Sequence, residues 1–268
     1  MEKVAIAIAP VSGASTRVYP HDVARDVLRC VDFGASIVHL HVRDLTGNLT
    51  KDVTQFERTI HEIRHKSDLI IQASTGGVSA MSIEDRCAPL YCTGVEMASL
   101  NVGSVNLGDA VYSNPRKDVE YCSREIVSLD ITPEFEIFEI GMINNVLLLG
   151  ETIPFKTPLL FNFVLGYPGS VPATVESMIA LRQLIPKGAL WAVTHFDRRD
   201  FSLLGAAVGL GAKVVRLGFE YSNFLDANTT AESNAALVEK LARLIRSMDR
   251  KVATPDETRK MLKISPQS

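Results

Sequence analysis

Short apolar runs alternate with longer stretches of helical period along almost the whole chain, and no other feature constrains its fold as strongly. This alternation is typical of βα units that build a parallel sheet covered by helices. Plausible helices lie at 21–33, 52–65, 171–184 and 230–248. The eight predicted strands are 4–9, 37–42, 69–73, 95–98, 134–138, 159–165, 190–193 and 213–217.

The number of predicted strands favours a closed barrel over an open sheet. The sequence has no GxGxxG after the first strand and no GxxxxGK[ST], the two motifs of common nucleotide-binding sheets. We therefore predict an α/β fold of the TIM (β/α)8 barrel type, with residues 1–268 forming one domain. A last helix begins with Thr254 as N-cap and Pro255 after it, and we expect this helix to pack on the barrel. In such barrels the chemistry lies at the C-terminal ends of the strands.

Charge and composition argue against several classes of partner. The chain has 28 Lys and Arg against 31 Asp and Glu, a formal net charge of −3, which argues against a nucleic-acid binder. No apolar run reaches the length of about 18 residues that spans a membrane, so we expect no membrane partner. The opening MEKVAIAIAP has too short an apolar run for a signal peptide, and the four cysteines form no CxxC pair. We expect a cytoplasmic protein with buried thiols.

Two histidines and an arginine alternate along the second predicted strand and just beyond it. Because successive side chains of a strand point to opposite faces, His39, His41 and Arg43 share the face that enters the barrel. A lone inward histidine is more often a satisfied core residue than a ligand. An HxH pair is different, because it places two ring nitrogens a few ångström apart and so suits Zn²⁺ or a similar ion.

A third ligand is available after the last predicted strand, 213–217. This strand lies beside 4–9 in a closed barrel and therefore near 37–42, so Glu220 can complete a His₂Glu set that leaves positions open for substrate. Taken alone, Glu220 is better explained as a loop carboxylate in a surface ion pair. Arg216 lies within the apolar strand itself, where a buried guanidinium requires an anion. That anion is either a substrate carboxylate or a carboxylate of the protein.

Other strand ends also carry polar side chains. Ser74 opens the string STGG after the third strand, and Ser99 and Asn101 follow the fourth. Glu134 and Glu136 share one face of the fifth strand, so they are either both inward or both solvated.

Seven strings occur in register along the chain, and together they resemble the β-keto acid cleavage enzymes, the family that includes 3-keto-5-aminohexanoate cleavage enzyme. The resemblance runs from Ala9 to the segment 253–259, which is nearly the whole chain. Each string alone is a weak signal, whereas seven in one order are specific. They are HLHVRD, STGG, EMASLNVGSVNLGD, PEFEIFEIGM, FNFVLGYPG, VRLGFE and AESNAALV.

The resemblance implies a TIM barrel, usually a homotetramer, with one Zn²⁺ per chain. It implies a transferase reaction of retro-Claisen type, in which a β-keto acid and acetyl-CoA give acetoacetate and a new acyl-CoA. Zinc would act as a Lewis acid on the β-keto acid, and hydroxyls would donate to oxyanions. The family's metal ligands fall on His39, His41 and Glu220. Its substrate contacts and its arginine fall on Ser74, Ser99, Asn101, Glu136 and Arg216.

Three positions depart from the family pattern. Tyr221 stands where the family has an Asp that works with the arginine in moving the substrate proton, and a tyrosine with an ordinary pKa of about 10 is a poor base. Ser15 stands where members with amine-bearing substrates have Glu. Without that carboxylate a cationic substrate tail loses its partner, so we expect the substrate to be a neutral or anionic β-keto acid. His195 lies in a stretch that replaces a glycine-rich one. It is either a candidate for the missing base or a helix-cap or surface residue.

Two alternatives to this enzyme remain open at the level of the sequence. The first is a metal-dependent barrel hydrolase, although such enzymes carry the HxH pair on the first strand and an Asp after the eighth. The second is a non-catalytic paralogue that binds metal and β-keto acid but lost turnover when Tyr221 replaced the Asp.

Overall fold

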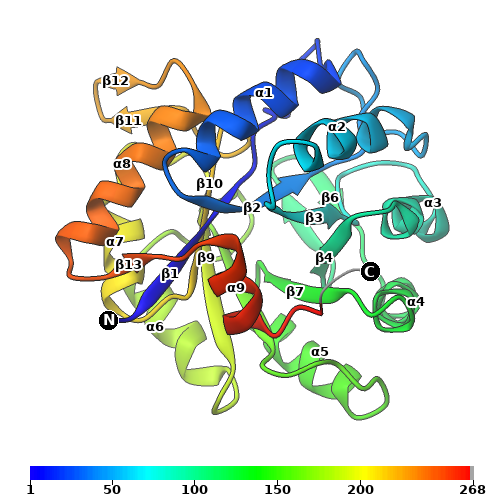
Figure 1. Ribbon diagram of the computed structural model, residues 1–268. Helices are drawn as coiled ribbons and strands as arrows, with labels where there is room; N and C mark the ends of the chain where they lie inside the picture. The colour runs from blue at the N-terminus through cyan, green and yellow to red at the C-terminus, as the bar shows by residue number, and fades with distance from the viewer. Residues whose placement is uncertain (266–268) are drawn as a thin grey trace.

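The computed structural model describes residues 1–265, and eight parallel strands form a closed barrel inside a ring of helices (Figure 1). The barrel strands are β1 (Lys3–Ile8), β2 (Ala35–Leu40), β3 (Ile70–Ser74), β4 (Val95–Asn101), β7 (Thr132–Ile137), β8 (Leu160–Leu165), β9 (Leu190–His195) and β10 (Val214–Leu217). They pair in this order, and β10 pairs with β1 to close the ring. The structure thus confirms the predicted TIM barrel.

Helices follow the barrel strands, and two small hairpins project from its loops. The helices are α1 (Pro20–Val31), α2 (Thr54–Arg64), α3 (Ile83–Cys87), the 3-10 helix η1 (Ala88–Tyr91), α4 (Arg116–Ser128), α5 (Gly141–Gly150), α6 (Val175–Leu184), α7 (Ser202–Gly209), α8 (Asn234–Ser247) and α9 (Pro255–Leu262). The hairpins pair β5 (Val105–Leu107) with β6 (Ala110–Tyr112) and β11 (Phe224–Asp226) with β12 (Thr229–Thr230). A short strand, β13 (Lys251–Val252), pairs with the start of β1.

The sequence predicted all eight barrel strands, but some of their ends differ. β2 ends at Leu40, so the predicted end at residue 42 is wrong and His41 follows the strand. β4 continues to Asn101, three residues past its predicted end. The predicted helices do not include α3, α4, α5 or α7. For α5 and α7 the reason is that GMINNVLLLG and SLLGAAVG are apolar on nearly every side and so lack a helical period.

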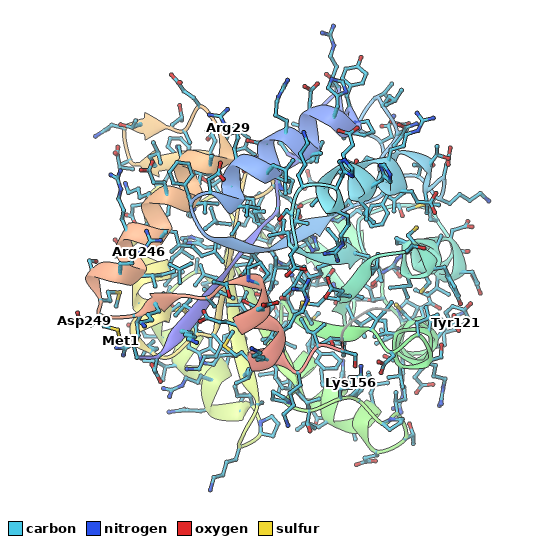
Figure 2. The ribbon with its side chains drawn as sticks, in the orientation of Figure 1. Met1, Arg29, Tyr121, Lys156, Arg246 and Asp249 are labelled. Atoms are coloured by element: carbon cyan, nitrogen blue, oxygen red, sulfur yellow. The ribbon has the colours of Figure 1, made fainter. Side chains whose placement is uncertain are left out.

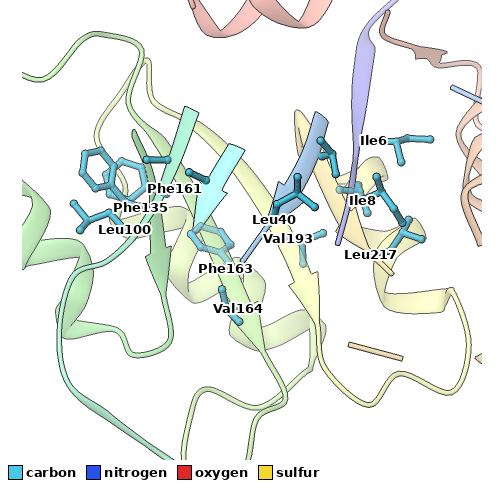
Figure 3. Packing of buried hydrophobic residues seen from close by; sticks show 14 of the residues in the cluster. Ile6, Ile8, Leu40, Leu100, Phe135, Phe161, Phe163, Val164, Val193 and Leu217 are labelled. Carbon is cyan, nitrogen blue, oxygen red and sulfur yellow. The ribbon is translucent and has the colours of Figure 1, made fainter. Parts of the chain in front are cut away.

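The outward faces of the barrel strands form the main core together with the inner faces of the helices. Figure 3 shows part of this cluster, in which Leu40, Phe135 and Phe163 are almost wholly buried. Exposed charged side chains such as Arg29, Arg246 and Asp249 lie at the periphery in Figure 2. The apolar outward face of each barrel strand thus packs against the helices, as the alternation in β2 predicts.

A second, smaller cluster fills the N-terminal half of the barrel interior, and we call it the apolar layer. Leu262 and Ile264 from the C-terminal segment pack against this layer, and α9 lies before the barrel centre in Figure 1. Thr254 and Glu257 form a capping box that starts α9. The apolar layer consists of Ala5, Ala7, Ile37, Ile70, Met97, Leu160, Ala192 and Val214.

Within residues 1–265, no helix combines the length and the apolar character needed to cross a membrane.

Candidate metal and substrate site

Two imidazoles and one carboxylate meet at the C-terminal end of the barrel. The Nε2 atoms of His39 and His41 lie 3.4 Å apart, and Glu220 Oε1 lies 3.3 Å from His41 Nε2 and 4.0 Å from His39 Nε2. Among residues 1–265, these three side chains make up the group of His, Cys, Asp and Glu whose ligand atoms lie close enough to share one metal ion. Two ring nitrogens and a carboxylate oxygen match the ligand set of a catalytic zinc site.

The backbone after β10 explains how a residue so distant in sequence reaches the histidines. β1 lies between β10 and β2 in the barrel. The inward side chains of β1 are the small Ala5 and Ala7, so they leave space between the two neighbouring strands. Gly218 has a φ of +139°, and a Cβ there would overlap the carbonyl oxygen of Ala9. The chain therefore folds closely over the end of β1, and Glu220 N donates to Ala9 O at 3.3 Å.

The electrostatics of the triad favour a cation. Burial raises the pKa of Glu220, but His41, His39 and Arg216 together outweigh it, and the pKa is lowered to about 2. Burial and the positive charge of Arg216 hold the pKa of His39 well below its ordinary value. At neutral pH the triad thus offers an ionised carboxylate and a neutral His39, the protonation states that bind a metal.

Arg216 lies beside the triad and has several protein partners. Its Nη1 donates to Glu136 Oε1 at 2.7 Å and to the Tyr221 hydroxyl at 3.2 Å. Its Nη2 donates to Gln72 Oε1 at 2.9 Å and also to Glu134 Oε1. Both glutamates therefore point inward, and the anion that the guanidinium requires is supplied by the protein itself.

These contacts continue across the barrel as a hydrogen-bonded chain, which we call the polar layer. Asn162 Nδ2 donates to Glu134 Oε1 at 2.9 Å, and Thr194 Oγ1 donates to Asn162 Oδ1 at 3.1 Å. Sequence analysis missed Gln72 and Asn162, although each is a lone polar residue within an apolar strand. The polar layer consists of His39, Gln72, Glu134, Asn162, Thr194 and Arg216.

One guanidinium contacts two buried carboxyl groups, Glu134 and Glu136. Burial and the neighbouring Glu220 carboxylate raise the pKa of Glu136 to about 8. Burial also raises the pKa of Tyr221 well above its ordinary value, despite the opposing effect of Arg216. At neutral pH the Tyr221 phenol is therefore protonated, whereas Glu136 is a carboxyl group that can exchange a proton.

The predicted hydroxyl and amide residues lie on β3 and β4, and β4 adjoins the strand that carries Glu136. Ser74 is opposite Ser99 in the register of β3 and β4, and Asn101 is opposite Glu136 in that of β4 and β7. Within the described residues, Ser99 Oγ and Asn101 Nδ2 have no hydrogen-bond partner. Both are buried polar atoms on β4, with Ser99 opposite Glu134 and Asn101 opposite Glu136 on β7.

Two other predicted residues are less directly connected to this centre. Ser15 lies in the loop after β1, where its carbonyl oxygen contacts Gly47. His195 ends β9, and burial lowers its pKa. In the part of the chain that the structure describes, no hydrogen bond or ion pair joins His195 to the triad or to Arg216.

Aromatic rings line the opposite side of the barrel mouth. Tyr112 and Phe138 meet edge to face, Phe138 lies 5.8 Å from Tyr167, and Tyr167 stacks on Phe196 at 3.9 Å between ring centroids. A Cβ at Gly76 would overlap the Tyr112 hydroxyl, so the glycine lets this ring approach the end of β3.

Comparison with known proteins gives consistent matches. The model of the beta-keto acid cleavage enzyme family matches residues 15–264. The 3-keto-5-aminohexanoate cleavage enzyme of Fusobacterium nucleatum is 35% identical over 91% of this chain and 89% of its own length. The 3-oxoadipate:acetyl-CoA acetyltransferase of Cupriavidus necator is 33% identical over 85% of this chain and 81% of its own. The structure of ObcA bound to oxaloacetate superposes with a TM-score of 0.79 over 93% of this chain and 67% of that one; at 17% identity, this likeness concerns the fold alone.

Proposed function

This chain belongs to the β-keto acid cleavage enzyme family, and we propose that it is zinc-dependent and converts a β-keto acid and acetyl-CoA into acetoacetate and a new acyl-CoA. It is an enzyme of the acyl-CoA-forming transferase class, in keeping with its relatives. The observation that carries the proposal is the triad of His39, His41 and Glu220 beside the buried Arg216.

Zinc held by the triad would act as a Lewis acid toward the keto and carboxylate oxygens of the substrate. Arg216 would place its positive charge near the enolate, and its two carboxyl partners hold the guanidinium in place. Ser99 and Asn101 offer unpartnered polar groups to the substrate oxygens, and Ser74 lies beside them.

The proton of the substrate's α-carbon passes to Glu136. In the metal-free protein, burial and Glu220 raise the pKa of this group to about 8, so it can exchange a proton near neutral pH, whereas Tyr221 is protonated and donates a hydrogen bond at most. The carbanion forms a carbon–carbon bond to the acetyl carbonyl, and the CoA thiolate leaves. That thiolate attacks the original keto carbonyl, the neighbouring carbon–carbon bond breaks, and protonation of the released carbanion gives acetoacetate. His195 remains the alternative proton carrier.

The substrate tail is neutral or anionic. Ser15 places no carboxylate in the loop after β1, so a cationic tail has no counter-ion there. The far side of the mouth is built from uncharged aromatic rings that include Tyr167 and Phe196.

One observation favours a second candidate, a paralogue that binds metal and β-keto acid without turnover. Tyr221 is buried, protonated, and hydrogen-bonded to Arg216 at the position where the family has a carboxylate. In that case Tyr221→Asp would restore product formation to a silent protein, whereas a fully active wild type would exclude the candidate.

The direct test uses zinc-loaded protein, acetyl-CoA labelled with ¹³C in its acetyl group, and a panel of neutral, anionic and cationic β-keto acids. The proposal requires ¹³C in acetoacetate and an unlabelled acyl group in the new acyl-CoA, both detected by mass spectrometry. Product that forms without acetyl-CoA would instead indicate a hydrolase. A panel that covers all three charge classes and gives no product with zinc bound would overturn the proposed reaction.

The proposal also includes a cytoplasmic homotetramer, as in the family. Light scattering is expected to give a mass near four times 29.3 kDa.

A further inference from the structure

Gln72 lies where the metal triad and Arg216 meet. It is fully buried on β3, and its Oε1 lies 2.8 Å from His39 Nδ1 and 2.9 Å from Arg216 Nη2. Its Nε2 has no partner among residues 1–265. A single amide oxygen thus contacts both His39 of the triad and the buried guanidinium of Arg216.

The chemistry of the three groups allows one direction of hydrogen bonding. A guanidinium has only donors, so the side of the amide that faces Arg216 must be the oxygen. An amide oxygen only accepts, so the bond from His39 requires a proton on Nδ1. A neutral imidazole carries one proton, and His39 Nε2 is then left with its lone pair directed at His41 and Glu220.

We propose that Gln72 is a positioning residue through which Arg216 fixes the metal-binding tautomer of His39. The proposal rests on the proposed metal site and adds a residue that is not one of its three ligands. Without the acceptor, Nδ1–H of His39 would be buried and unpaired. The proton would then favour Nε2, where His41 Nε2 lies at 3.4 Å, and it would occupy the atom that must bind the metal.

The main variant is Gln72→Met, which keeps the length of the side chain but has no amide oxygen. In metal-free protein labelled with ¹⁵N-histidine, NMR is expected to show the Nδ1–H tautomer of His39 in the wild type and a predominant Nε2–H tautomer in Gln72→Met. Zinc affinity, measured by competition with a chromophoric chelator, is expected to fall about 10- to 100-fold. Gln72→Glu retains acceptor oxygens and is expected to keep the wild-type tautomer.

Asn162→Leu provides the matched control. Asn162 is an equally buried amide of the polar layer, but its partners are Glu134 and Thr194 rather than a metal ligand. This variant is expected to lose stability while its zinc affinity stays within about twofold of the wild type, because metal affinity is sensitive to the partners of the ligands themselves.

The outcomes separate this inference from the proposed function. A wild type that binds no zinc would overturn the metal site, while the NMR comparison would still test the tautomer. If the wild type binds zinc and Gln72→Met keeps the same His39 tautomer and the same zinc affinity, the proposed role of Gln72 is wrong. If Gln72→Met fails to fold, Gln72→Glu decides, since loss of the Nδ1–H tautomer in that variant contradicts the proposal.

Discussion

The two halves of the barrel interior are equally buried but chemically opposite. The apolar layer packs against the C-terminal segment, whereas the polar layer lies two residues further along several of the same strands. Ile37 precedes His39, Ile70 precedes Gln72, and Val214 precedes Arg216 in this way. One barrel therefore holds a hydrophobic plug at its N-terminal end and a hydrogen-bonded network at its C-terminal end.

This difference separates residues that stabilise the fold from residues that serve chemistry. A fully buried aliphatic side chain contributes about 1.5–3 kcal/mol relative to an exposed one. A buried ion pair contributes little compared with apolar residues of the same size, because desolvation offsets the attraction between its charges. The polar layer is thus better explained by the reaction than by stability, and each half can be disturbed separately.

The largest expected effect is loss of the metal in the C-terminal half. We expect His39→Ala to remove one of three ligands and to abolish zinc binding and product formation. Zinc content after dialysis, measured by atomic emission, checks this expectation. One equivalent of zinc retained per chain would contradict the His₂Glu assignment.

The next effect concerns the proton. We expect Glu136→Gln to lower kcat by about 10²- to 10⁴-fold, as removal of a general base does, with zinc content unchanged. In the zinc-loaded wild type, kcat/KM should rise with pH and level off below about 8, because Glu136 accepts a proton only when ionised and bound zinc offsets the Glu220 charge that helps to raise its pKa in the metal-free protein. Steady-state rates measured from about pH 6 to about pH 9 with saturating zinc test both expectations. An unchanged rate in Glu136→Gln would favour His195 as the proton carrier.

The same group makes stability depend on pH. Its folded pKa of about 8 exceeds the ordinary value of 4.5, so the native state binds this proton more tightly than the unfolded state does. The resulting stabilisation is full below pH 4.5 and is lost as the pH rises through about 8. Glu136→Gln should flatten this part of the stability curve of metal-free protein, measured by urea unfolding.

Glu134→Leu tests the cost of an unbalanced charge within the polar layer. Arg216 would lose a fully buried partner, and we expect the free energy of unfolding to fall by about 3–5 kcal/mol. Activity should fall as well, since the guanidinium is no longer held on both sides. A variant that keeps wild-type stability would show that Glu136 alone suffices to balance Arg216.

Ile37→Ala makes the corresponding change in the apolar layer. The cavity should cost about 2–5 kcal/mol of unfolding free energy while zinc affinity remains near that of the wild type. Chemical denaturation and metal titration of one preparation give both values. A large loss of zinc affinity would mean that the two layers are coupled.

The smallest effect is expected outside the barrel. Thr254→Ala removes the side chain that caps α9 and should cost about 0.5–2 kcal/mol, with no change in activity. Thermal unfolding measures the loss. A change in kcat would show that α9 influences the distant C-terminal end.

Local pattern accounts for much of what could be predicted. The βα alternation identified all eight barrel strands, and the period of two in β2 placed His39 inside the barrel. The helix α5 was missed because it has no polar face. The role of Gln72 could not be predicted for a different reason. One polar residue in an apolar strand indicates that its side chain is buried, but not which residues it hydrogen-bonds to.

By itself, the sequence determined the barrel, the inward HxH pair and the need of Arg216 for an anion, because these follow from periodicity and from the chemistry of single residues. Only the tertiary structure decided that Arg216 contacts two carboxyl groups of the protein, Glu134 and Glu136, that Glu220 reaches the histidines across β1, and that Gln72 lies between His39 and Arg216. The reason is physical: hydrogen-bond partners and pKa shifts depend on which strands meet and how they are staggered, and closure of the barrel sets that stagger.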